Sequence, residues 1–295
     1  MNALPSDPIT DLLTTYNELN SSTITILDEA PSALEFMRFV ALNRPFIVRG
    51  FASDWKATST WSLSHLRSTL SSHEVNVAVT PHGNADSPTL NDDGELVFVK
   101  PWEESQSFPD FVDFVSQQEL HERNEEEVRY AQTLDREFAF HHVPPQRPLP
   151  KHLRSDSRTK TFYSTSPLFH PCINEVPLSS TSYVRSTSDP ATLNIEPDSP
   201  SVELPVATWD PDVPSRNPTK YSHLAQPMHV TLEKGDMLYL PALWYHKVGQ
   251  SCGEDGICVA ANYWYDMDFG GSFWPLCNFV RSVSLQDEAK RESTA

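Results

Sequence analysis

The stretch GDMLYLPALWYH, residues 235–246, decides the fold. Its first two residues have the composition of a turn, and the apolar run 237–240 predicts a short strand that ends at Pro241, because proline cannot donate to a strand ladder. A second strand is predicted at 244–248, and it carries His246 at a position that could face into the mouth of a barrel. A histidine among aromatic residues is more often structural than a ligand, so the pattern alone leaves both roles open.

Further strands are predicted on either side of this stretch. Residues 228–232 alternate apolar and polar side chains, and 257–265 form another run after a glycine-containing loop. Short strands with tight turns and no helix between them indicate an antiparallel sheet that closes into a sandwich or barrel. Eleven prolines fall between 167 and 227, which predicts long irregular connections and little core there, apart from an extended piece at 202–208.

The N-terminal half is predicted to mix helices with strands. Apolar residues recur at helical spacing over three segments, and short apolar runs indicate strands between and after them. An acidic outer helix with an apolar seam is predicted within 103–137. We therefore expect a helical N-terminal region, residues 1–75, packed on a domain of residues 76–285, with a disordered tail at 286–295. The predicted helices are 9–19, 32–42 and 61–70, and the predicted strands are 45–50, 75–80 and 96–99.

Composition excludes several classes of protein. The 295 residues include 22 Lys and Arg against 40 Asp and Glu, a net charge of −18, which repels phosphate backbones and anionic lipid. No nucleic acid or membrane partner is therefore expected. Four cysteines without a C-x-x-C pair, and no leader or long apolar run, predict a reduced protein of the cytoplasm or nucleus.

Several blocks of the sequence resemble one family. Residues 235–246 are similar to the signature of the second metal histidine in the Jumonji-C (JmjC) branch of cupin-fold iron(II) and 2-oxoglutarate oxygenases. Residues 43–50, NRPFIVRG, resemble the strand by which those proteins begin the fold, and 79–86 and 262–267, VTPHGNAD and NYWYDM, resemble the JMJD-seven lysyl hydroxylase group. The resemblance implies a mainly β fold with α-helices, a JmjC/cupin double-stranded β-helix or jelly-roll behind a helical N-terminal region.

The resemblance also implies a set of site residues. In the family a His-x-Asp pair and a later histidine hold Fe(II) and leave positions for 2-oxoglutarate and oxygen. His246 matches the later histidine, and Lys160 resembles the lysine that grips the distal carboxylate of 2-oxoglutarate. Tyr130 and Asn262 resemble positions that line the same co-substrate pocket. The alternatives are a surface lysine, a structural tyrosine and an asparagine satisfied by the backbone. No catalytic residue is assigned.

The His-x-Asp pair itself is absent, since none of the eleven histidines is followed two positions later by Asp or Glu. The family would place it within 130–165, an interval that is short here and filled with basic, proline-rich sequence. We therefore expect an incomplete barrel. Three explanations stay open: a gene model or splice form that omits or misreads an exon, a genuine pseudo-oxygenase with a rebuilt pocket, or substitute ligands. The candidate substitutes are His152 with Asp156, or His141 with His142.

The resemblance implies that an intact relative uses Fe(II) and 2-oxoglutarate to hydroxylate a protein side chain, lysine in particular. In this chain the missing pair predicts impaired activity. The alternative hypotheses are a non-catalytic cupin-like interaction module, dimeric through its terminal helices, and a truncated product that barely folds. The charge of −18 favours a basic protein substrate or partner through long-range attraction.

Overall fold

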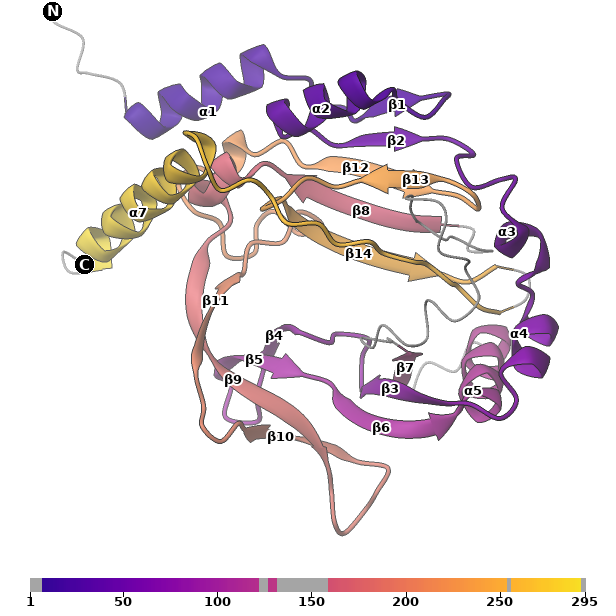
Figure 1. Cartoon of the computed structure of the whole chain (residues 1–295). Helices are drawn as coiled ribbons and strands as arrows, with labels where there is room; N and C mark the ends of the chain where they lie inside the picture. The colour runs from indigo at the N-terminus through magenta and orange to yellow at the C-terminus, as the bar shows by residue number, and fades with distance from the viewer. Residues whose placement is uncertain (1–6, 122–126, 132–158, 254–255, 293–295) are drawn as a thin grey trace, which may run out of the picture.

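The structure, a computed structural model, describes residues 7–121, 127–131, 159–253 and 256–292. Its strands form two layers that face each other, with helices at the ends (Figure 1). The predicted class, mainly β with helices in a jelly-roll, is confirmed. The predicted gap in the barrel falls on 132–158, outside the described residues, and stays a prediction.

The first layer joins strands from both ends of the chain. One sheet has the order β1-β2-β13, with β2 parallel to β1 and antiparallel to β13. The second has the order β12-β8-β14 and is antiparallel throughout. Because β2 is a fully buried apolar run, it forms the centre of its sheet. The bounds are β1 Thr25–Leu27, β2 Phe46–Val48, β8 Thr159–Thr165, β12 Met228–Leu232, β13 Met237–Tyr239 and β14 Tyr245–Ser251.

The second layer contains the remaining strands. One sheet has the order β6-β3-β7, and the other has the order β10-β9-β5-β4 with β11 also paired to β9. Alternate valines of β3 (75, 77 and 79) point into one core cluster, as the two-residue period of a strand requires. The bounds are β3 Glu74–Thr80, β4 Ser87–Leu90, β5 Leu96–Lys100, β6 Trp102–Ser107, β7 Val128–Ala131, β9 Glu175–Arg185, β10 Leu193–Pro197 and β11 Glu203–Ala207.

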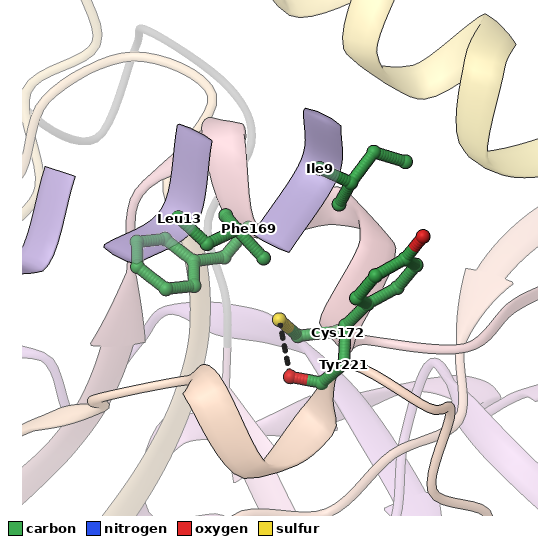
Figure 2. Close-up of a cluster of buried hydrophobic side chains, with 5 residues drawn as sticks. All are labelled: Ile9, Leu13, Phe169, Cys172 and Tyr221. Carbon is green, nitrogen blue, oxygen red and sulfur yellow. Dashed lines mark hydrogen bonds between the residues drawn. The ribbon is translucent and has the colours of Figure 1, made fainter. Parts of the chain in front are cut away.

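Helix α1, Pro8–Leu19, packs on the short 3-10 helix η1, Pro167–Cys172. Ile9 and Leu13 lie against Phe169, Cys172 and Tyr221 in a buried cluster (Figure 2). The thiol of Cys172 donates a 3.1 Å hydrogen bond to the carbonyl oxygen of Tyr221, and burial raises its pKa to about 12. The remaining helices are α2 Ala33–Leu42, α3 Lys56–Thr60, α4 Leu63–Thr69, α5 Phe108–His121, η2 Ser222–Leu224 and α7 Phe273–Glu292.

Helix α7 is fixed to β9 through Glu175. The Glu175 carboxylate accepts hydrogen bonds from Arg281 on α7, and its Oε2 lies 3.3 Å from Nε2 of the buried His170. Burial raises the pKa of the Glu175 carboxyl, but the nearby His170 and Arg281 outweigh this effect and hold it below its usual value. This carboxylate therefore stays charged and links three elements.

The prediction of little core within 167–227 is wrong. Strand β9, with eleven residues, lies there, and Phe169 and Cys172 are buried. The prolines did not exclude a sheet because they sit where no donor is needed: Pro177 of β9 is directly opposite Pro205 of β11. A count of prolines could not reveal that register.

Three other predictions need correction. The expected strand at 257–265 is irregular apart from one isolated bridge, and the expected acidic helix begins at Phe108, after β6. Residues 286–292, predicted as a disordered tail, continue α7 because Gln, Glu, Ala, Lys and Arg are strong helix formers. In the described part of the chain, no helix is both long and apolar enough to cross a bilayer.

Candidate functional site

The turn before β13 is held by Asp236, which is only 4% exposed. Its Oδ1 accepts a 3.0 Å hydrogen bond from the N–H of Gly50, and its Oδ2 accepts from the N–H of Glu233 at 3.0 Å and from the guanidinium of Arg49. Gly235 has φ +89°, and a Cβ there would lie 2.8 Å from Oγ of Ser53. The two blocks 235–246 and 43–50, far apart in sequence, are therefore packed against each other.

The start of β14 is fixed by a second contact between the same blocks. Nε1 of the buried Trp244 donates to the carbonyl oxygen of Asn43 at 2.9 Å and to its Oδ1 at 2.6 Å. In return the amide of Asn43 donates to the carbonyl oxygen of Ala242 at 3.2 Å. Asn43 ends α2 in the left-handed conformation, φ 48°, which asparagine tolerates better than most residues. These bonds hold the backbone two residues before His246.

His246 lies near the start of β14 with its side chain exposed. Its Nδ1 is 2.9 Å from the carbonyl oxygen of Trp244. Because a carbonyl oxygen only accepts, Nδ1 carries the hydrogen, and Nε2 of the neutral ring keeps a lone pair free for a metal or a proton. This is the arrangement of a ligand histidine whose orientation is fixed by its second nitrogen.

Lys160 lies on the strand next to His246. The backbone of His246 pairs with Ser164 of β8, and Lys160 is four residues away from Ser164 on that strand. Since side chains alternate along a strand, the register places 160 and 246 on the same face of the sheet. The side chain of Lys160 lies outside the described part of the chain.

The other two predicted residues lie elsewhere. Asn262 is exposed in the irregular segment after β14. Tyr130, on β7, lines a cavity of about 530 Å³ together with Asp86, Glu103 and Trp102, whereas neither His246 nor Asn262 lines it. The structure therefore places residues 160 and 246 on one face of neighbouring strands, four residues apart in register, and places Tyr130 at a cavity that His246 does not line.

The described residues do not fit an iron centre. Among them, no group of three or more His, Cys, Asp or Glu side chains could hold a metal ion. Lys247, which follows His246, pairs with Asp210 at 2.8 Å and with Asp212. These two carboxylates therefore already have a cation. His246 stays a predicted ligand position, and no reaction step through iron follows from it. His141, His142, His152 and Asp156 fall outside the described residues.

Sequence reasoning missed two residues of the cavity at Tyr130. Asp86 and Glu103 both line it, and the signal for Asp86 was present in the block 79–86. Burial and the charge of Glu103 raise the pKa of Asp86, with Lys100 opposing. Burial, Asp86 and Glu103 together raise the pKa of Tyr130 to about 12. Asp86 and Glu103 therefore make the electrostatic potential at the Tyr130 hydroxyl more negative.

Comparison with known proteins agrees with the fold. The family described as a cupin-like domain matches residues 31–161 and 159–271. The "Bifunctional peptidase and (3S)-lysyl hydroxylase JMJD7" of Homo sapiens is 30% identical over 83% of this chain and 85% of its own. "JmjC domain-containing protein E" of Dictyostelium discoideum is 26% identical over 90% of each chain, and "Lysine-specific demethylase JMJ32" of Arabidopsis thaliana is 26% identical over 93% of this chain and 91% of its own.

The family matches include strands of both layers and the blocks that hold Asp236 and Trp244 in place. The similarity to the human relative extends over most of both chains. The chain belongs to the JmjC family of cupin-like proteins.

Proposed function

We propose that this chain is a pseudo-oxygenase of the JmjC family, related to lysyl hydroxylases, that binds a protein partner and does not oxidise 2-oxoglutarate. The observation that carries the proposal is the isolation of His246. Its Nε2 is free to bind a metal, yet the sequence contains no His-x-Asp pair and the described residues supply no other ligand set. One imidazole cannot replace the three protein ligands of a facial triad.

The lengths of the alignments support a missing segment. The human alignment spans 300 positions, whereas 83% of this chain is about 245 residues, so about 55 positions have no residue here. The Dictyostelium alignment, 321 positions over 90% of the chain, gives a similar difference. The two family matches also meet at 159–161, where β8 begins. This supports the loss of the strand that would carry the other ligands.

The partner we propose is a protein. The human relative is named as a lysyl hydroxylase and the Arabidopsis relative as a lysine-specific demethylase. A surface with net charge −18 attracts basic proteins over long distances. A scaffold that has lost its metal ligands can keep such an interaction.

Production of succinate tests the proposal. The purified chain is mixed with Fe(II), 2-oxoglutarate and a lysine-containing protein extract in air, and succinate is measured for wild type, His246→Ala and the control His65→Ala, an exposed helical histidine. We expect all three to give the background of the reaction without protein. Succinate above background that disappears in His246→Ala and persists in His65→Ala would contradict the proposal.

A second candidate is an active lysyl hydroxylase encoded by a longer transcript, and the meeting of the two family matches at 159–161 favours it. Sequencing the transcript across the codons for residues 130–165 separates the two. An additional in-frame exon that encodes His-x-Asp would assign the activity to the longer product.

A further inference from the structure

We infer that the cavity beside Tyr130 binds an organic cation of the arginine type, carried by a protein partner, and excludes 2-oxoglutarate. The inference rests on the proposed function, because it names the chemistry of the partner that a chain without turnover would bind. It also replaces the co-substrate role that the sequence suggested for Tyr130.

The cavity has the size and walls of a ligand pocket. Its volume of about 530 Å³ lies within the range of roughly 300–1,000 Å³ typical of such sites. Strands β3, β6, β7 and β9 contribute to its lining, so it is built on the sheet rather than on one loop. The residues that matter for recognition are Asp86, Lys100, Glu103 and Tyr130.

The charges of the cavity favour a cation. Among the described residues that line the cavity, Lys100 is the cation. Nζ of Lys100 lies 2.5 Å from Oδ2 of Asp198. Asp198 also accepts a hydrogen bond from Ser182. Lys100 is therefore paired with Asp198, although its charge also lowers the pKa of Asp86, and Asp86 and Glu103 have no ion pair within the described residues. Two carboxylates remain for a ligand.

The electrostatic environment of Tyr130 agrees with this. Asp86 and Glu103 act on Tyr130 in the same direction as burial and raise its pKa, and Glu103 also raises the pKa of Asp86. A negative potential at the tyrosine hydroxyl opposes 2-oxoglutarate, which carries two negative charges at neutral pH. The same potential stabilises a bound cation.

The ring of Tyr130 favours a guanidinium over an ammonium group. Tyr130 and Glu103 both pair with Ala78 of β3 and therefore lie on one face of the sheet. The rings of Trp102 and Tyr183 pack in a buried cluster with Val99, so Tyr130 is the ring beside the carboxylates. A planar guanidinium can stack on an aromatic ring and pair with a carboxylate at the same time, and it is more weakly hydrated than an ammonium group. An arginine side chain of a basic protein combines these features with the long-range attraction expected from the net charge of −18.

The test measures binding to the full chain without iron. Ligand-observed NMR titrations compare three capped tripeptides, Ala-Arg-Ala, Ala-Lys-Ala and Ala-citrulline-Ala, with 2-oxoglutarate. Citrulline has nearly the shape of arginine but no charge. We expect saturable binding of the arginine peptide, weaker binding of the lysine peptide, and no detectable binding of the citrulline peptide or 2-oxoglutarate.

Variants connect the binding to the cavity. Asp86→Asn and Glu103→Gln should each lower the affinity for the arginine peptide by about fivefold. This loss corresponds to the upper end of the stabilisation that a part-exposed ion pair provides. Glu203→Gln, an exposed acid on β11, is the matched control and should leave affinity unchanged. Circular dichroism confirms that each variant is folded, and the citrulline comparison needs only the wild-type chain.

Two results would overturn the inference: equal binding of the arginine and citrulline peptides, or binding of 2-oxoglutarate that Tyr130→Phe weakens. Succinate formation, which tests the proposed function, is a separate readout. Turnover together with charge-dependent arginine binding would refute the pseudo-oxygenase and keep the cavity assignment. Lack of turnover together with charge-independent binding would keep the pseudo-oxygenase and refute the cavity assignment.

Discussion

Replacing Asp236 tests whether the two blocks that define the fold depend on each other. Asp236→Ala removes the acceptor of the Gly50 and Glu233 N–H groups and the partner of Arg49. The two backbone donors take part in part-buried hydrogen bonds, and a donor left without its acceptor costs about 1–3 kcal/mol. The side chain of Arg49 is 39% exposed, so loss of the ion pair adds no more than about 1 kcal/mol. We expect a decrease in the free energy of unfolding of about 3–5 kcal/mol.

Asp236→Asn should lower the free energy of unfolding by less, about 2–3 kcal/mol. The amide oxygen can still accept from the N–H of Gly50, but the amide NH₂ faces the donors of Glu233 and Arg49. The assay is urea unfolding followed by circular dichroism, with Asp93→Asn as the control. Asp93 is exposed in a turn, and its variant should stay within about 0.5 kcal/mol of wild type. If Asp236→Ala costs less than about 1 kcal/mol, the turn is not docked on residues 49–50 and the account of the site is wrong.

Other parts of the structure give three further predictions. Leu13→Ala, in the fully buried cluster under α1, should lower the free energy of unfolding by about 2–5 kcal/mol in the same urea assay, and a change below about 1 kcal/mol would show that α1 is not packed there. Glu175 has its folded pKa below its unfolded value, so its stabilisation is present above about pH 4.3 and is lost as the pH falls through the folded pKa. The stability difference between wild type and Glu175→Gln should therefore shrink on acidification, and a constant difference would refute the contact. Cys172, with its pKa raised to about 12, should resist a thiol reagent at pH 8 until the chain unfolds, and rapid labelling of the native protein would contradict its burial.

Local signals predicted much of the fold. The strand 46–48, the strands 228–232 and 237–239 and the helix 8–19 lie close to where periodicity and Pro or Gly boundaries indicated. Pairing between strands was not visible in the same way. Strand β13 pairs with β2, about 190 residues earlier in the chain, and not with its sequence neighbour β12. Contacts of this kind depend on tertiary packing and leave no periodic pattern in one segment.

The candidate site was predicted only in part, for a related reason. The family resemblance predicted His246 as a ligand, which stays a prediction, and the register of β8 and β14 places it on the same face as residue 160. Nothing in one strand indicated that Tyr130 would share a cavity with Asp86 and Glu103. Their proximity is created by the pairing of β3 with both β6 and β7, and it changes the expected ligand from an anion to a cation.

An anaerobic titration of the chain with Fe(II), followed by calorimetry, tests the isolation of His246 most directly. The account predicts no stoichiometric site and identical titrations for wild type and His246→Ala, because one imidazole does not hold iron(II) firmly. One iron bound tightly per chain, and lost in His246→Ala, would show that other side chains complete the centre and that this protein retains a metal site.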